Sequence, residues 1–151
     1  MKRRSGERGS VFIEFSLTFL LLFAVFGGTF EFGYSFYAYN RLVNAVREGA
    51  RYASMRPYDS ATSTPSTAFL TAVKNMVVYA DPNPAQGATP IVKGLTTSNV
   101  NLTVLCSGQQ PMQMTVSIVN FSIDAVFGTV TLNNKPSESF PYLGIPTPPS
   151  S

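Results

Sequence analysis

An uncharged, strongly apolar run from Phe15 to Phe30 restricts the possible folds of this chain more than any other feature. A membrane-spanning helix needs about 20 mostly apolar residues. The segment Phe15–Tyr37 supplies that length, with Glu31 as its one charged residue. We therefore predict a helix that crosses a membrane near the start of the chain.

Basic residues precede the apolar run. Residues 1–9 contain Lys2, Arg3, Arg4 and Arg8 against one glutamate, and they account for the whole formal net charge of +3. Basic residues stay on the cytoplasmic side of a membrane, so we expect the N-terminus in the cytoplasm and the C-terminus outside. Since the rest of the chain is formally neutral, the charge gives no support for nucleic-acid binding.

A secretory signal peptide is the alternative to a retained helix. The apolar part of a signal peptide is usually about 7–15 residues long and ends at a small-residue cleavage site. Here the run is longer, and the nearest match to such a site, Val25-Phe26-Gly27, is weak. The length of the run favours a helix that stays in the membrane.

Aromatic rings recur along the apolar run at spacings of three and four residues, which places them on one helical face. They are Phe15, Phe19, Phe23, Phe26 and Phe30. Two interpretations remain open. The rings are either lipid-facing bulk of an ordinary anchor or a stripe that packs against neighbouring helices.

The segment after the apolar run is amphipathic. Its apolar residues fall on one helical face, with charged residues nearer the other; the apolar positions are Leu42, Ala45, Val46, Gly49 and Ala53. No proline occurs before Pro57, so we predict one helix from about residue 11 to about residue 55. Such a helix is roughly 65 Å long, about twice the hydrocarbon thickness, so its second half must project outward as a spine. Glu48 and Arg51 are expected to form a solvated surface pair.

The residues beyond this helix predict a small α+β domain. Arg56–Pro65 is expected to be a loop, with Thr64 capping a helix that has Pro65 at its first position. This helix carries an apolar stripe and ends at Asp81-Pro82, before a second loop that reaches Pro90; the stripe is Phe69, Val73, Met76, Val77 and Ala80.

Alternating apolar and polar residues predict strands in the last third of the chain. The clearest are 100–106 and 112–118, joined by a hairpin-like connection. Residues 121–127 read as a short amphipathic turn, whereas 129–132 and 137–142 are expected to complete a small antiparallel sheet. The resulting fold class is α+β, with a long helix packed on a small sheet and one additional helix. The Pro-rich tail, 141–151, is expected to fray.

Catalytic chemistry is not apparent in the sequence. Histidine is absent, and we find no nucleophile–base set, ligand cluster or phosphate-binding glycine loop. We predict no enzyme activity, no cofactor and no metal site. The single cysteine, Cys106, is expected to be a small buried apolar residue rather than a reactive thiol. Asp59, Asp81 and Asp124 are expected in turns, where aspartate stabilises its own backbone.

With these residues laid out, the chain resembles the TadE-like family, pilin-like components of tight-adherence pilus systems related to type IV pili. The resemblance covers about residues 8–54. It rests on three segments, which are Arg8-Gly9-Ser10-Val11-Phe12-Ile13-Glu14-Phe15, Glu31-Phe32-Gly33, and Asn44-Ala45-Val46-Arg47-Glu48-Gly49-Ala50-Arg51-Tyr52-Ala53. It implies a pilin-like fold.

The resemblance also implies processing. A prepilin peptidase would cut between Gly9 and Ser10, so that Glu14 and Phe15 become the fifth and sixth mature residues. The new ammonium at Ser10 of one subunit would then pair with Glu14 of a neighbour, because two opposite charges leave water together at lower cost than either alone. The alternative is that Glu14 has no pairing role and lies at the level of the lipid headgroups. For Glu31 two positions remain possible, either at the outer interface of the membrane or facing a partner helix.

Together these features predict four segments: a basic leader at 1–9, a membrane and spine helix at 10–55, an extracytoplasmic domain at 56–140 and the tail. The leading functional hypothesis is a minor pilin or pseudopilin in a bacterial inner membrane. Its expected partners are the prepilin peptidase, other pilin subunits, the assembly platform and membrane lipid, with no nucleic acid. The alternative is a membrane-anchored binding or adhesion module. A membrane-tethered enzyme has little support.

Overall fold

The computed structural model describes residues 7–60, 62–125 and 128–145. Two α-helices, α1 (Glu7–Met55) and α2 (Thr67–Tyr79), are followed by a short 3-10 turn, η1 (Thr97–Asn99), and five strands. The strands are β1 (Val100–Ser107), β2 (Gln110–Ile118), β3 (Phe121–Asp124), β4 (Thr129–Leu132) and β5 (Ser137–Pro141). The predicted α+β class, with a long N-terminal helix, one more helix and small antiparallel sheets, is confirmed. Most of the predicted leader, residues 1–6, lies outside the described residues.

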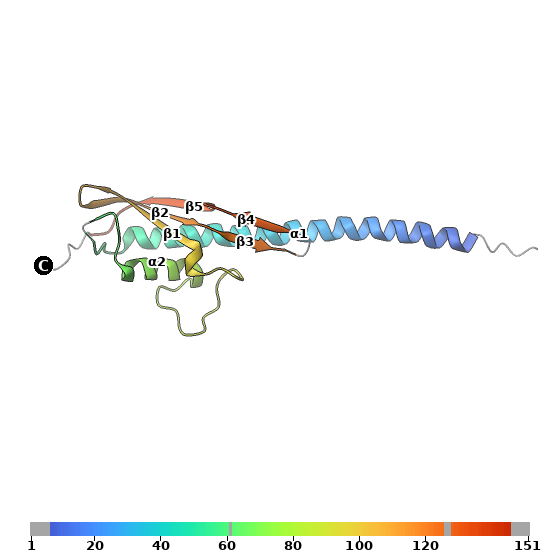
Figure 1. Ribbon diagram of the computed structural model, residues 1–151, viewed down its shortest axis with the longest axis horizontal. Helices are drawn as coiled ribbons and strands as arrows, with labels where there is room; N and C mark the ends of the chain where they lie inside the picture. The colour runs from blue at the N-terminus through green and yellow to red at the C-terminus, as the bar shows by residue number, and fades with distance from the viewer. Residues whose placement is uncertain (1–6, 61, 126–127, 146–151) are drawn as a thin grey trace, which may run out of the picture.

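Helix α1 is continuous but has two different environments (Figure 1). Its first half projects from the molecule, whereas its second half runs through the outer domain. The predicted amphipathic face is buried there, with Leu42, Val46 and Ala53 at 0% exposure. The second half of the helix therefore serves as the spine of the domain, as expected.

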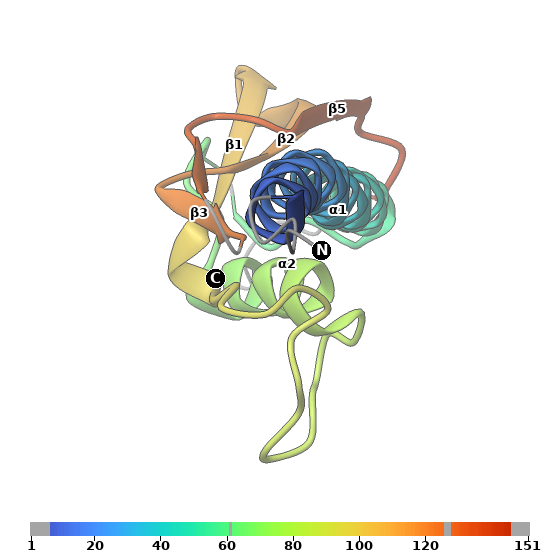
Figure 2. The same cartoon turned by 90° about the vertical axis from the view of Figure 1, so that its right-hand side faces the viewer.

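The outer domain covers this spine from two sides. Viewed along α1, the strands lie on one side of the helix and α2 on the other (Figure 2). Buried side chains from all three layers form one core, including Phe69 of α2 and Met114, Val116 and Ile118 of β2. Since a domain of this size buries only a modest core, the long helix supplies much of its apolar surface.

The strands form two sheets rather than the single sheet expected. The larger sheet has the order β1-β2-β5, and β3 pairs only with β4; all pairs are antiparallel. The prediction of a turn at 121–127 is wrong for the residues described, because Phe121 and Ile123 are buried in strand β3 while Ser122 and Asp124 are exposed. Residues 126–127 lie outside the described part of the chain.

Two asparagines divide the sheets. Asn120 has φ 50° between β2 and β3, and Asn134 has φ 57° between β4 and β5. Asparagine adopts this left-handed conformation more readily than most residues. Without these two residues, β2 and β3 would form one long strand, paired with a second long strand made of β4 and β5. Asn120 and Asn134 interrupt the two long strands, so the β3–β4 pair is separate from the β2–β5 pair.

Helix α2 begins two residues later than predicted. Ser66, not Thr64, is its N-cap, and its hydroxyl accepts a hydrogen bond from the Phe69 amide at 3.1 Å. Asp59 fixes this cap, because its carboxylate accepts hydrogen bonds from both the amide and the hydroxyl of Ser66. Asp59 therefore holds a residue seven positions away, beyond the local turn expected of it.

The end of α1 farthest from the projecting half is closed by the C-terminal segment. The hydroxyl of Tyr142 accepts a hydrogen bond from the Tyr58 amide at 2.9 Å and donates one to the Arg56 carbonyl at 3.1 Å. The amides of Leu143 and Gly144 donate to the carbonyl of Ser54. The expectation that the tail frays from residue 141 is therefore wrong as far as Gly144; residues 146–151 are not described.

Alkaline pH is expected to loosen this end of the domain. Burial raises the pKa of Tyr58 from 10.0 to about 12, and burial raises the pKa of Tyr142 as well. Because the folded state favours the neutral phenols, their contribution to stability is complete below about pH 10 and is lost as the pH rises towards 12. We expect the thermal midpoint of the full chain in detergent micelles to fall by several degrees over this interval.

The control for this prediction is a matched pair of variants. Tyr58→Phe removes one of the two phenols with a raised pKa, Tyr58 and Tyr142, and should reduce the dependence of the thermal midpoint on pH. Tyr37→Phe removes a phenol from a side chain that is 58% exposed and should leave it unchanged. If the thermal midpoint falls equally with pH in both variants, ionisation of Tyr58 is not the cause of the alkaline loss of stability.

Candidate functional site

The projecting half of α1 is apolar on every side and uncovered. Its side chains from Val11 to Phe30 are exposed almost throughout, and the most apolar 18-residue window of the helix has no buried residue. Among the described residues this is the one helix long and apolar enough to cross a membrane. The rings of Phe15, Phe19 and Phe23 stack in sequence, with centroids 6.2 Å and 6.3 Å apart.

This exposure does not distinguish the two interpretations of the phenylalanine stripe. Phe26 and Phe30, at 74% and 64%, are exposed to about the same degree as Leu21 on another face, at 69%. The stripe therefore remains a prediction, either as a lipid-facing surface or as a surface for other helices.

Gly9, Ser10 and Glu14 lie on the first turns of α1, at the end farthest from the outer domain. A Cβ built at Gly9 would meet nothing within 4 Å, so the fold does not require glycine there. The Glu14 side chain is exposed, while its backbone carbonyl accepts a hydrogen bond from the Thr18 hydroxyl at 2.9 Å. Both Gly9 and Glu14 are thus available to act on something outside this chain.

Glu31 marks the level at which the outer domain begins. It is half-buried, and a Cβ built at Gly128 would lie 3.6 Å from its Oε1 atom, so the carboxylate faces the start of β4. An open groove of about 640 Å³ runs beside it between α1 and the β3–β4 sheet. From the sequence alone, Glu31 was expected either at the outer interface of the membrane or against a partner helix. Its approach to Gly128 of its own chain was not predicted.

Gly33 differs from Glu31 although the two are neighbours in the family segment. A Cβ at Gly33 would meet nothing within 4 Å. No contact among the described residues therefore explains a glycine at this position.

The charged residues of the third family segment, residues 44–53, lie on the outer surface of the spine. Glu48 and Arg51 form the expected ion pair at 3.1 Å, with both side chains about half exposed. Arg47 forms a second pair with Glu138 of β5 at 3.5 Å. Exposed pairs of this kind contribute at most about 1 kcal/mol, so the Arg47–Glu138 pair adjusts the docking of β5 rather than holding it.

Gly49, in the same segment, is buried at a contact between the two α-helices. A Cβ at this position would lie 2.2 Å from Cγ2 of Val77, which is itself fully buried in α2. Only glycine permits this approach without a shift of the neighbouring helix. Sequence reasoning identified Gly49 as a motif residue but not its partner, because nothing local points to a contact 28 positions away.

Tyr52, in the same segment, contacts Arg56, which follows the end of α1. The Arg56 guanidinium lies 5.7 Å from the centroid of the Tyr52 ring and 5.8 Å from that of Phe69, and it donates a hydrogen bond of 2.5 Å to the Tyr52 hydroxyl. Arg56 thereby connects α1 to the core aromatic of α2. Tyr52 acts in the packing of the domain.

The remaining candidate residues do not form a chemical site. Cys106 is half-buried at the edge of the core, and is therefore more exposed than the buried residue expected. Asp81 forms the local turn predicted for it, accepting a hydrogen bond from the Asn83 amide at 2.9 Å. Within the described ranges, no group of three or more cysteine, aspartate or glutamate residues is placed to hold a metal ion.

Comparison with known proteins gives one result. The family model described as TadE-like protein matches residues 9–51. No curated protein and no solved structure matches the chain. The matched range begins at Gly9 and includes Glu14, Glu31, Gly33 and the segment 47–51, whereas Tyr52 lies just beyond it. The segment from Gly9 to Arg51 is therefore similar to TadE-like proteins.

Proposed function

We propose that this chain is a membrane-anchored, pilin-like subunit that takes part in the assembly of a tight-adherence pilus. The observation that carries the proposal is the division of α1 into an uncovered apolar half and a half buried in its own domain. The 21 residues from Ser10 to Phe30 rise about 32 Å, which matches a hydrocarbon core of about 30 Å. The match of residues 9–51 to the TadE-like family supports a role in this pilus system.

In this proposal the outer domain stands outside the inner membrane and the N-terminus lies in the cytoplasm. Among the described strands, β3 and β4 pair only with each other, so each has an open edge, which supports a domain outside the hydrocarbon. The basic residues before the apolar run support a cytoplasmic N-terminus. The membrane surface then lies close to Phe30. The partners are the prepilin peptidase, other pilin or pseudopilin subunits and the assembly platform, and the contacts are made by the projecting helix.

The mass of the mature protein tests the proposal. When the full chain is produced together with a prepilin peptidase, we expect intact-mass measurement to show loss of residues 1–9 and a free amine at Ser10. A chain that retains Met1, or one cut near Gly27, would contradict it.

A variant at the cleavage position supplies the control. Gly9→Leu introduces a bulky side chain beside the scissile bond and is expected to leave the leader attached. Since a Cβ at Gly9 would meet nothing within 4 Å, the substitution does not disturb the fold. If the variant folds normally but keeps its leader, the defect lies in cleavage by the peptidase and not in folding.

A further inference from the structure

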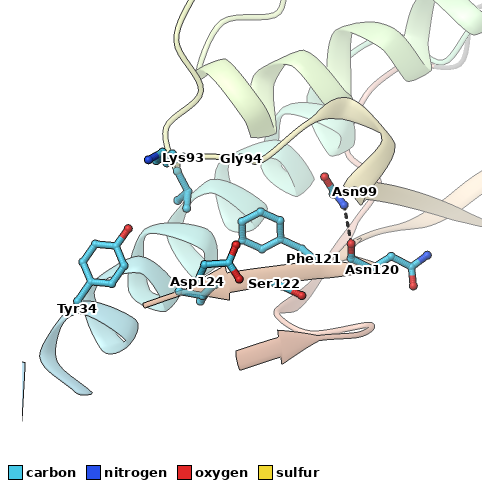
Figure 3. Close-up of a pocket in the computed structure, with 10 residues that line it drawn as sticks. Tyr34, Lys93, Gly94, Asn99, Asn120, Phe121, Ser122 and Asp124 are labelled. Carbon is cyan, nitrogen blue, oxygen red and sulfur yellow. Dashed lines mark hydrogen bonds between the residues drawn. The ribbon is translucent and has the colours of Figure 1, made fainter. Parts of the chain in front are cut away.

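A polar pocket lies on the outer domain next to the projecting helix. Its volume is about 430 Å³, and it is formed where α1, β3 and the segment before η1 meet (Figure 3). Tyr34, Lys93 and Asp124 lie at one end, and Asn99 and Asn120 lie at the other. The pocket thus offers a cation, a carboxylate and a phenol within one concave surface.

Neither charge in this pocket is neutralised by an ion pair within the described part of the chain. The ion pairs among the described residues are Arg47–Glu138 and Arg51–Glu48, so neither Lys93 nor Asp124 belongs to one. One oxygen of Asp124 accepts a hydrogen bond from the Thr129 hydroxyl at 3.2 Å, which leaves the other available. A ligand that carries both an anion and an amine would satisfy Lys93 and Asp124 together.

A second, more apolar pocket adjoins the first. It has a volume of about 350 Å³ and shares Tyr34 and Asp124 with the polar pocket. Its other lining residues are Phe30, Glu31 and Ala125, and Phe30 places its opening beside the apolar half of α1. The two pockets therefore form a path from a charged end to the surface that faces lipid.

The height of the polar pocket fits the headgroup layer of a membrane. Tyr34 lies four residues beyond Phe30, about 6 Å along the helix axis. The headgroup region adds about 5–8 Å on each side of the hydrocarbon core. A polar group at the level of Tyr34 and Asp124 therefore meets lipid headgroups when the helix spans the membrane.

From these observations we infer that the paired pockets bind an aminophospholipid whose phosphate contacts Lys93 and whose primary amine contacts Asp124. The acyl chains leave through the apolar pocket beside Phe30. The inference rests on the membrane anchoring proposed above, but it does not depend on a role in a pilus. It gives the domain a specific contact with the outer surface of its membrane.

Native mass spectrometry of the full chain in detergent tests this site. The protein is offered equal amounts of phosphatidylethanolamine, phosphatidylcholine and phosphatidylglycerol. We expect phosphatidylethanolamine to be retained about tenfold over the others, because its primary ammonium both carries a positive charge and donates hydrogen bonds to the Asp124 carboxylate. A quaternary amine has no N–H to donate, and a glycerol headgroup has no positive charge. Equal retention of the three lipids would overturn the inference.

Charge variants locate the binding. Asp124→Asn is expected to abolish the preference for phosphatidylethanolamine, and Lys93→Gln is expected to weaken retention of all three lipids. The matched controls are Asp81→Asn and Lys135→Gln, which make the same changes at exposed positions outside both pockets. Unchanged lipid retention in the two pocket variants would place the lipid elsewhere and overturn the site.

Free phosphoethanolamine distinguishes a lipid from a soluble ligand of the same chemistry. We expect it to be retained at least about tenfold less than the lipid, because it lacks the acyl chains that occupy the apolar pocket. Equal retention would overturn the lipid part of the inference. A protein that is cut normally after Gly9 but shows no lipid preference would overturn the lipid site and leave the proposed function intact.

Discussion

Replacing Gly49 with leucine is expected to lower the free energy of unfolding of the outer domain by at least about 3 kcal/mol. A Cβ at this position would lie 2.2 Å from Cγ2 of Val77, and both sites are fully enclosed between α1 and α2. A leucine therefore forces the two helices apart and uncovers core residues such as Val46. Chemical denaturation of the full chain in detergent micelles, followed by circular dichroism, measures the loss.

A double variant tests whether Val77 is the cause. Gly49→Ala alone is expected to destabilise the domain by about 1–3 kcal/mol through overpacking. Val77→Ala removes the obstructing methyl groups, so the double variant should be less destabilised than the sum of the two single variants. Gly33→Ala is the matched control, because a Cβ at Gly33 meets nothing within 4 Å. Strict additivity of the two single effects would rule out the close contact as the cause.

Replacing Glu14 with glutamine is expected to reduce co-purification of the mature chain with other pilin subunits at least about tenfold. In the proposed assembly the Glu14 carboxylate neutralises the Ser10 ammonium of a neighbour. Removing one partner of a buried ion pair typically costs about 3–5 kcal/mol, because the other charge is left uncompensated. Affinity capture from membranes that contain the whole pilus system measures the effect.

The variants chosen for this test leave the subunit itself intact. The Glu14 side chain is exposed in the isolated chain, so glutamine does not disturb its packing. Glu48→Gln makes the same chemical change in a surface ion pair and should leave co-purification unchanged. Full recovery of the partner subunits with Glu14→Gln would remove the charge-pairing mechanism, while normal cleavage after Gly9 would show that the peptidase still recognises the chain.

Local patterns in the sequence were sufficient for the spine helix. Leu42, Ala45, Val46, Gly49 and Ala53 were placed on one face by their spacing alone, and that face is buried. The pattern is reliable because it extends over several turns and no proline interrupts it. The same holds for β1, where Val100 and Val104 are buried and the intervening polar residues are exposed.

The errors occurred where a distant residue decides between local alternatives. Thr64 and Ser66 are both plausible helix caps, and the contact from Asp59 selects Ser66. Strand β3 is only four residues long, so its alternation is too short to distinguish from a turn; its pairing with β4 defines it. Such selections require the tertiary fold, which no local pattern contains.

The candidate functional site was also predicted from the sequence only in part. The apolar run and its basic flank predicted a membrane helix from composition alone, and the helix is long and apolar enough to cross a membrane. The pocket between Lys93 and Asp124 was not predicted, because these residues are 31 positions apart and neither belongs to a motif. Only the return of β3 along α1 brings them to one surface.

The bonds between the C-terminal segment and Ser54 carry a consequence for the order of export. Strand β5 pairs with β2, and the amides of Leu143 and Gly144 close the end of α1. In the proposed topology these residues are the last of the described chain to reach the outer side. Until they arrive, the spine lacks part of its cover, so a stalled or shortened chain would stand in the membrane with an unfinished domain. Completion of this domain therefore requires that the chain has been translocated at least as far as Gly144.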